Sequence, residues 1–208
     1  MMNFNFNVAE LLFALPELFL LFAISLILLF DLFVSQRLKQ FTYYLTQLAL
    51  LITGFLAFNL IGENATIFSG TFVLDSLGST FKVFILGFAI IALVYTRHYL
   101  KAHELLRNEY FILAMMSILG MMVMVSGHSL LTLYLGLEIM SLSLYALIAT
   151  ARDRASAIEA ALKYFVLGAI ASGLLLYGMS MIYGISGSLD ISQISSFASA
   201  STLGSQQT

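Results

Sequence analysis

The chain of 208 residues contains no cysteine, no tryptophan and a single proline, and only 10% of its residues are charged. Without cysteine, neither a disulfide framework nor a thiolate metal site can form. The three histidines, His98, His103 and His128, do not match the spacing of a metal-binding motif. Lysine and arginine form no basic face of the kind that binds nucleic acid. The sequence therefore argues against a metalloprotein and against a nucleic-acid-binding protein.

Apolar residues dominate what is present. Hydrophobic residues make up 61% of the chain, whereas a soluble domain is roughly half apolar and about a quarter charged. The apolar segments are continuous, and a backbone that faces lipid must satisfy its own hydrogen bonds, so helices are expected rather than the alternating strands of a barrel. The first residues lack the basic region and cleavage site of a secretory signal, so the first apolar segment is expected to remain as a helix. The composition predicts a polytopic membrane protein.

The predicted fold class is all-α, a polytopic transmembrane helix bundle. Six transmembrane helices are predicted, at residues 11–34, 42–61, 79–97, 109–127, 129–150 and 157–184. Residues 1–184 thus form a six-helix transmembrane segment. Residues 185–208 turn to Ser, Gly, Ala and Gln and are predicted to be a polar loop or tail, with the chain cut before further helices.

Positive charges in the predicted loops lie on one side of the membrane only. They are Arg37, Lys39, Arg97, Lys101, Arg107, Arg152 and Arg154. The connections on the other side, namely 1–10, 62–78, 127–129 and 185–208, contain no lysine or arginine. Because loops rich in lysine and arginine stay in the cytoplasm, both ends of the chain are predicted to be non-cytoplasmic.

Two charged residues of opposite sign lie inside the last two apolar segments. Glu138 is near the middle of the fifth segment and Lys163 is in the sixth. A charge at membrane depth costs at least ~2.5–3.5 kcal/mol, so it persists mainly where it has a function. The pair predicts a proton or ion path. The rise per residue puts Glu138 ~8 Å deeper than Lys163, so direct contact needs an extended lysine or intervening water.

Less functional interpretations of both residues stay open. Glu138 could be paired to a neighbouring helix for packing alone. Lys163 could reach the cytoplasmic surface with its long side chain, or pair with Glu159 one turn earlier on the same helix.

Two further ionisable residues lie near the non-cytoplasmic ends of the predicted spans. Lys82 opens the third span, where it runs against the orientation rule, and is expected to reach the surface or to pair with Asp75. Glu17 follows the only proline, Pro16, and is expected to satisfy backbone groups that a local helix distortion leaves free.

Four sequence segments carry a resemblance to a known family. They are Leu133–Leu142 (LYLGLEIMSL), Glu159–Phe165 (EAALKYF), Phe72–Gly78 (FVLDSLG) and Tyr183–Leu189 (YGISGSL). Together they resemble subunit N of the proton-pumping NADH–quinone oxidoreductase, respiratory complex I. The paralogous subunits L and M, and related antiporter subunits, usually place tryptophan directly before the glutamate. Here Leu137 takes that place, which favours subunit N.

The resemblance carries implications for fold and function. Family members have roughly fourteen helices that include two inverted repeats, so this chain would be the N-terminal portion of one. The proton-translocating residues of the family map onto Glu138 and Lys163. The chain would bind no cofactor, since NADH, FMN, Fe–S clusters and quinone (such as ubiquinone) belong to partner subunits. Its partners would be other membrane subunits of complex I, the lipid bilayer and the quinone that the complex uses, in a bacterial inner membrane.

Two other functions would also accommodate a buried Glu–Lys pair. One is a subunit of a multisubunit cation/proton antiporter or of a membrane-bound hydrogenase. The other is a structural scaffold in which Glu138 and Lys163 only hold helices together.

Overall fold

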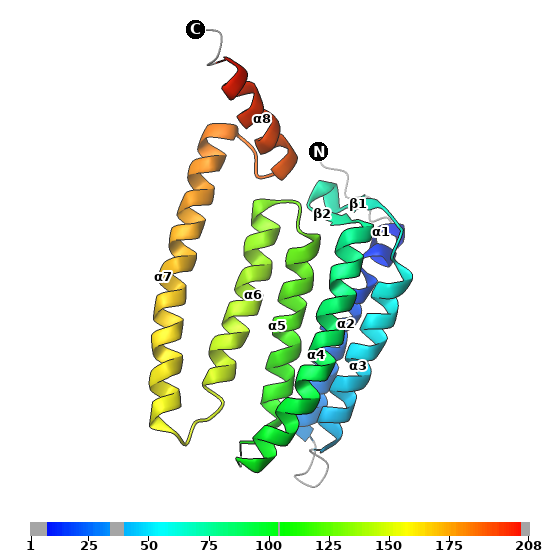
Figure 1. Ribbon diagram of the computed structural model, residues 1–208, viewed down its shortest axis with the longest axis vertical. Helices are drawn as coiled ribbons and strands as arrows, with labels where there is room; N and C mark the ends of the chain where they lie inside the picture. The colour runs from blue at the N-terminus through cyan, green and yellow to red at the C-terminus, as the bar shows by residue number, and fades with distance from the viewer. Residues whose placement is uncertain (1–7, 34–39, 104, 205–208) are drawn as a thin grey trace.

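The computed structural model describes residues 8–33, 40–103 and 105–204 (Figure 1). Within these ranges, six helices are long and apolar enough to cross a membrane, which confirms the six predicted spans. They are α2 (Leu15–Phe33), α3 (Gln40–Asn59), α4 (Ser76–Ala102), α5 (Asn108–Ser126), α6 (Leu130–Ile148) and α7 (Ala155–Ser186). The chain is a helix bundle, as its composition predicts.

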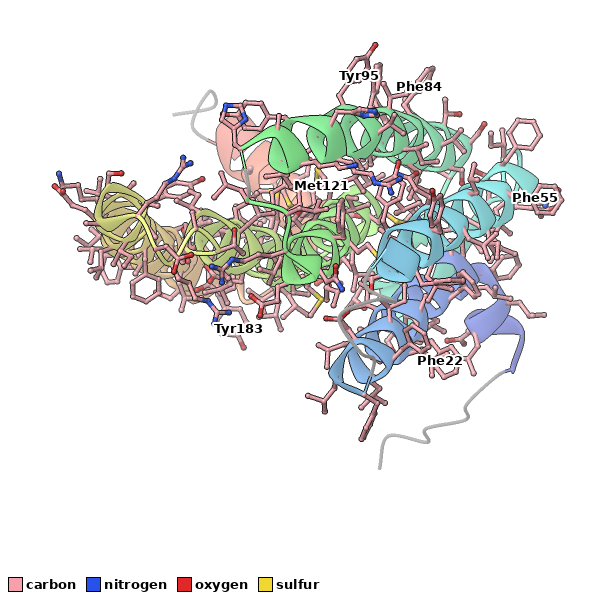
Figure 2. All side chains as sticks on the ribbon, turned by 90° about the horizontal axis from the view of Figure 1, so that it is seen from below. Phe22, Phe55, Phe84, Tyr95, Met121 and Tyr183 are labelled. Carbon is pink, nitrogen blue, oxygen red and sulfur yellow. The ribbon has the colours of Figure 1, made fainter. Side chains whose placement is uncertain are left out.

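Four of the helices form a compact bundle, and the other two extend from one side of it. Helices α2 and α4 each pack against both α3 and α5, and α6 packs against α5. Helix α7 packs mainly on α6 and stands apart from the other helices (Figures 1 and 2). One long face of α7 and part of α6 therefore remain uncovered.

The apolar core lies between α2, α3, α4 and α5. Leu20, Leu50, Leu86, Met115 and Met122 are each at most 1% exposed and come from all four helices. Large aromatic side chains project from the outside of the bundle instead, among them Phe22, Phe55, Phe84 and Tyr95 (Figure 2). Large apolar side chains on the outer surface suit a protein whose outer faces contact lipid or other apolar helices.

Two buried hydroxyl groups of α3 are satisfied within their own helix. Thr46 donates to the carbonyl of Thr42 (2.8 Å) and Thr53 donates to the carbonyl of Ala49 (2.7 Å). Both threonines are fully buried in α3. A hydroxyl that bonds to the carbonyl four residues earlier adds no unsatisfied donor to an apolar environment.

Helices α5 and α6 approach each other more closely than side chains would normally allow. A Cβ atom on Gly120 would lie 2.6 Å from the carbonyl oxygen of Gly136 and 2.6 Å from the amide nitrogen of Met140. A Cβ atom on Gly136 would lie 2.9 Å from the carbonyl oxygen of Gly120. Two glycines facing each other thus permit backbone contact, and they lie next to Glu138.

One end of the bundle, here called the hairpin end, is closed by a short antiparallel hairpin. Strand β1 (Ala65–Ile67) pairs with β2 (Phe72–Leu74), and a tight turn, η2 (Phe68–Gly70), joins them. Ile67 and Phe72 pack on Ala14, which separates α1 (Val8–Phe13) from α2. The hairpin therefore covers the start of α2.

The other connections at the hairpin end are hydrogen-bonded to this hairpin and to one another. The amide of His128 donates to the carbonyl of Thr71 (3.0 Å), and the amide of Leu130 donates to the carbonyl of Leu189 (2.9 Å). His128 Nε2 lies 2.6 Å from the hydroxyl of Ser192. A continuous band of backbone and side-chain contacts thus links the hairpin, the α5–α6 turn and the segment after α7.

The polar segment after α7 is helical where its composition suggested a loop or tail. Helix α7 ends at Gly187, which adopts the left-handed conformation (φ 71°) common after helix C-termini. Helix α8 (Ile191–Gly204) then begins, and Asp190 accepts a hydrogen bond from the amide of Gln193 (3.0 Å). An aspartate at this position caps the helix and explains where it begins. Whether further helices follow remains a prediction.

The opposite end of the bundle, here called the loop end, carries the basic loop residues. Arg97, Lys101, Arg107, Arg152 and Arg154 all lie at this end, in or beside the α4–α5 and α6–α7 connections. Arg37 and Lys39 lie outside the described residues. The asymmetry of charge agrees with the orientation argument, and the orientation itself remains a prediction.

Candidate functional site

Glu138 lies near the middle of α6 and faces α7. Its side chain is half-buried, and its Oε1 accepts a hydrogen bond from the hydroxyl of Ser172 on α7. The hydroxyl of Tyr134, one turn earlier on α6, lies 3.3 Å from the same serine oxygen. A carboxylate and two hydroxyl groups therefore form a polar cluster between two apolar helices. Such a cluster can bind and release a proton, because each member offers both an oxygen acceptor and, when protonated, a donor.

Small residues on α7 allow this contact. Gly168 lies one turn from Ser172 and faces Tyr145 of α6 so closely that a Cβ atom would lie less than 2 Å from the tyrosine hydroxyl. The rings of Tyr145 and Tyr164 meet edge to face at 4.8 Å. The pairing of Gly168 with Ser172 is the small-residue pattern that brings helices together in membranes.

Lys163 lies on a different face of α7 and does not approach Glu138. Its Nζ is 2.6 Å from Oε1 of Glu159, and the two side chains are 72% and 66% exposed. Ser172, which is level with Glu138, lies nine residues further along α7, which is about 13 Å along the axis and about half a turn around it. The difference in depth between Glu138 and Lys163 therefore exceeds the ~8 Å expected from the sequence. The reason is that α7 extends beyond the end of α6 at the loop end (Figure 1). The structure thus contains the Glu159–Lys163 pair that was one of the open alternatives.

A second ion pair is the most deeply buried charged feature of the described residues. Glu17 Oε1 on α2 lies 2.6 Å from Lys82 Nζ on α4, and the side chains are 8% and 1% exposed. The ring of Phe72 lies 5.0 Å from the ammonium group. Removing one partner of such a pair leaves an uncompensated buried charge and costs about 3–5 kcal/mol.

This pair corrects two sequence-based expectations. Lys82 neither reaches the surface nor pairs with Asp75, because Asp75 is the N-cap of α4 and accepts from the amide of Gly78 (2.7 Å). Pro16 does follow an interruption of the helix at Ala14, and the Glu17 side chain, expected to serve backbone groups, pairs with Lys82 on α4. A signal was available: two opposite charges lie at the same end of spans 1 and 3, and one of them violates the orientation rule.

A third polar cluster joins three helices near the loop end. Asp31 of α2 accepts hydrogen bonds from the hydroxyl of Thr42 on α3 (2.9 Å) and from the side-chain amide of Asn108 on α5 (2.5 Å). With two donors from two helices, the carboxylate fixes where α2, α3 and α5 end relative to one another.

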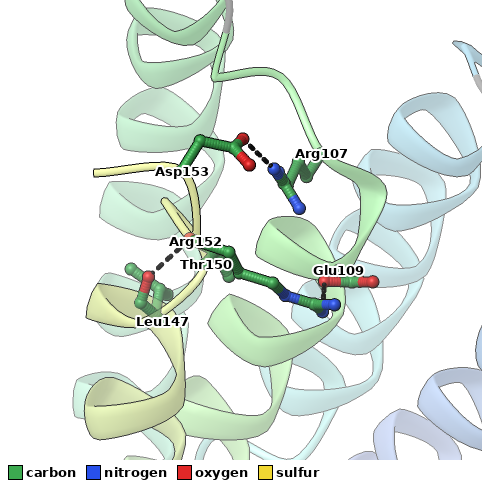
Figure 3. Close-up of polar contacts among 6 residues, drawn as sticks. All are labelled: Arg107, Glu109, Leu147, Thr150, Arg152 and Asp153. Carbon is green, nitrogen blue, oxygen red and sulfur yellow. Dashed lines mark hydrogen bonds and ion pairs between the residues drawn. The ribbon is translucent and has the colours of Figure 1, made fainter. Parts of the chain in front are cut away.

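Two surface ion pairs at the loop end connect the α4–α5 and α6–α7 connections (Figure 3). Nη2 of Arg107 lies 2.6 Å from Oδ2 of Asp153, and Nη2 of Arg152 lies 2.5 Å from Oε2 of Glu109. Exposed pairs of this kind contribute at most about 1 kcal/mol each. They fix the loop position and do not form a reactive site.

Nothing in the described part of the chain resembles a metal centre. Among these residues, no three histidine, cysteine, aspartate or glutamate side chains lie close enough to hold an ion.

Comparison with known proteins gives sequence matches over the whole chain. Residues 127–208, which include Glu138 and Lys163, match the family described as "NADH:quinone oxidoreductase/Mrp antiporter, TM". NADH-quinone oxidoreductase subunit N of Ruthia magnifica is 66% identical over 210 residues, covering 100% of this chain and 43% of that protein. Subunit N of Halorhodospira halophila is 50% identical over 195 residues, covering 93% of this chain and 40% of that protein.

Solved structures share the fold. A chain in the structure of respiratory complex I from Thermus thermophilus with bound aureothin superimposes with a TM-score of 0.70 and 28% sequence identity. The match covers 85% of this chain and 38% of that chain. A chain of the membrane-bound sulfane sulfur reductase, an archaeal respiratory membrane complex, gives a TM-score of 0.68 at 25% identity, covering 90% of this chain and 39% of that chain.

The six candidate membrane spans, the matching family and the shared fold place the chain in the class of antiporter-like membrane subunits. The chain is thus a multi-pass membrane protein. By its similarity to the relatives above, it belongs to the NADH-quinone oxidoreductase subunit N family. It spans between 40% and 43% of the length of those two relatives, so it corresponds to part of such a subunit.

Proposed function

We propose that this chain is part of a proton-translocating membrane subunit of an NADH:quinone oxidoreductase, and that Glu138 is its proton-exchanging group. The observation that carries the proposal is the contact of Glu138 with Ser172 and its neighbour Tyr134, in the segment that matches the family. A carboxylate that accepts a hydrogen bond from a hydroxyl group between two apolar helices is an arrangement expected of a proton relay in a membrane.

In this proposal Lys163 takes part from the uncovered face of α7. Its side chain points away from α6, on the face where a longer chain would pack. The relatives are more than twice as long as this chain, so helices outside it are available to contact Lys163. Lys163 would then exchange protons with groups beyond this chain, and Glu138 would reach it through water.

The redox steps would occur in partner subunits, which would hold NADH, FMN, Fe–S clusters and quinone. The link to them would be electrostatic. At an effective dielectric constant of ~20, a unit charge ~10 Å away changes the energy of ionised Glu138 by ~1.7 kcal/mol. A charge that appears and disappears in a neighbouring subunit during each cycle would therefore bias proton loading by more than tenfold.

The direct test is Glu138→Gln in the chromosomal gene. Glutamine keeps the shape and some hydrogen bonding but carries no exchangeable carboxyl proton, so NADH-driven proton pumping should fall on the order of tenfold or more while the complex still assembles. Glu109→Gln is the matched control, because Glu109 is an exposed carboxylate at the loop end and its loss should leave pumping unchanged. Normal pumping by the Glu138 variant would contradict the role.

A second candidate function is a subunit of a multisubunit cation/proton antiporter or of a membrane-bound hydrogenase. It is favoured by the matching family, whose description includes Mrp antiporters, and by the likeness to an archaeal respiratory complex. The two functions differ in their requirements. Dependence on NADH and sensitivity to quinone-site inhibitors would support the first, and sodium-dependent exchange without either would support the second.

A further inference from the structure

The Glu17–Lys82 pair lies far from the contact between α6 and α7 and has no part in the proposal above. Its two helices, α2 and α4, belong to the compact bundle, and both residues lie in the half of the bundle nearest the hairpin end. A buried ion pair is weak evidence for stability, because the loss of hydration on both groups is repaid only when further hydrogen bonds satisfy them. The pair therefore requires another reason for its presence.

Polar groups at the ion pair lack the hydrogen bonds expected of a pair that only stabilises the fold. Glu17 Oε2 and the hydroxyl of Ser79 are buried and have no hydrogen-bond partner among the described residues. Ser79 is 1% exposed and lies three residues before Lys82, so both point from the same face of α4. A free carboxylate oxygen and a free hydroxyl in an apolar bundle are groups that bind a proton or a proton-carrying water.

Other charged groups do not compete for this site. At the hairpin end, Glu10 of α1 is the acceptor for the amide of Phe68 (3.3 Å), and Asp75 caps α4. Glu63 is exposed in the connection before β1. The described residues of α3, β1 and β2 carry no charge, and the charged residue of α5 is at the loop end. Among the residues that the structure describes, Lys82 is thus the one charged partner of Glu17.

The hairpin covers the site at this end of the bundle. Phe72 of β2 lies over the Lys82 ammonium group and also packs with Ile67 on Ala14, three residues before Glu17. The same strand bonds to the α5–α6 turn, where Phe72 bridges to Gly127. A short covering of apolar side chains therefore separates Glu17 from the water at the hairpin end.

We propose that Glu17 and Lys82 form a second proton-binding site, which exchanges protons with water at the hairpin end. Glu17 takes one proton from a hydronium ion, leaving water, and becomes a neutral carboxylic acid beside the Lys82 ammonium group. The net charge of the site changes from zero to plus one, and the reverse step restores the ion pair. The role of this site in pumping rests on the proposed proton-translocating function; its ability to bind a proton does not.

Two variants in the intact complex separate a proton site from a packing contact. The single change Glu17→Gln removes the proton-binding group. The double change Glu17→Leu with Lys82→Met replaces the ion pair by apolar side chains of similar size, a substitution that stability alone tolerates. Glu63→Gln is the control, because it alters an exposed carboxylate at the same end.

The readouts are assembly on native gels, protons pumped per NADH oxidised, and the carboxylic-acid C=O band in the infrared difference spectrum between low and high pH. The expected result is an assembled double variant whose pumping falls on the order of tenfold, and a C=O band that Glu17→Gln removes and Glu138→Gln retains. The Glu63 control should pump normally.

Several results would overturn the proposal. Wild-type pumping by the double variant, an unchanged infrared band in Glu17→Gln, or failure of both variants to assemble would each assign the pair to packing. If the complex shows no NADH-driven pumping at all, the proposed function fails, while the infrared band still decides whether Glu17 binds a proton.

Discussion

At the scale of single residues, the chain separates its membrane-depth charges into two environments. Glu138 accepts a hydrogen bond from Ser172 between α6 and α7, whereas Glu17 is paired with Lys82 inside the bundle of α2 to α5. Glu138 faces α7, a helix whose surface is largely exposed, whereas Glu17 is buried in the interior of the bundle. These surroundings suit the two proposed tasks, in which Glu138 would pass protons onward and Glu17 would exchange them locally.

Asp190, outside the spans, has the clearest dependence on pH. The amide of Gln193 donates to its carboxylate and, with smaller contributions from Ser192 and His128, holds the pKa of Asp190 below its ordinary value of 3.8. Because the folded pKa is lowered, the stabilisation of α8 is complete above 3.8 and is lost as pH falls through the lower folded value. Amide hydrogen exchange in the first turn of α8 should therefore increase on acidification.

The variant Asp190→Asn provides the control for this prediction. Asparagine also caps helices but does not ionise in this range, so the pH dependence should disappear while the helix remains. Comparing the two proteins at each pH removes the intrinsic effect of pH on exchange. Equal pH dependence in both proteins would show that another group controls α8.

The residue scale is also where sequence reasoning was weakest. It selected Glu138 and Lys163 from their depth, and it missed the pairing of Glu17 with Lys82. A sequence alone does not indicate which spans touch, so it favours partners close in the chain, such as Asp75 for Lys82. The pair joins spans 1 and 3, and only the arrangement of four helices brings those two residues together.

At the scale of helices, the contact between α5 and α6 positions Glu138. Gly120 and Gly136 let the two backbones meet, and Gly136 lies two residues before Glu138. The six long helices could be predicted from apolar length alone. The hairpin could not, because each strand has three residues and is stabilised by packing on Ala14. Helix α8 was obscured by its serine-rich composition.

Gly120→Ala should disturb this contact. The new methyl group would lie 2.6 Å from backbone atoms of α6, which cannot rotate away, so overpacking should cost about 1–3 kcal/mol. Gly173→Ala on α7 is the matched control, because nothing lies within 4 Å of the added atom. Alanine there should be neutral or stabilise the helix by up to about 1 kcal/mol.

The measurement is the thermal unfolding midpoint of the purified assembly, followed through a tag on this chain. The Gly120 variant should unfold at a lower temperature than the parent, and the Gly173 variant should not. Similar unfolding of the two variants would mean that the close approach of α5 and α6 does not limit stability.

At the scale of the whole molecule, charge is distributed unevenly between the two ends. The hairpin end lacks lysine and arginine in its connections, and the loop end carries five of them within the described residues. The protein contains no cysteine, so single cysteines can report orientation without background. Glu63→Cys marks the hairpin end and Ala155→Cys marks the loop end, and both positions are exposed.

A membrane-impermeant maleimide added to intact cells should label Glu63→Cys, after passage through the outer membrane where one is present. Ala155→Cys should become labelled only when the inner membrane is opened, because positively charged loops remain cytoplasmic. Labelling in the reverse order would invert the orientation and place the exchange of protons at Glu17 on the cytoplasmic side.

The proposed function requires this chain to work inside an NADH:quinone oxidoreductase. This is tested by tagging the chain at its chromosomal gene, solubilising the membranes gently, and asking whether NADH-dependent quinone reduction migrates with the tag. Activity and tag should migrate together in a large assembly, and quinone-site inhibitors should stop the activity. A tag that migrates without this activity, or with sodium–proton exchange in its place, would exclude the proposed function and favour the antiporter function.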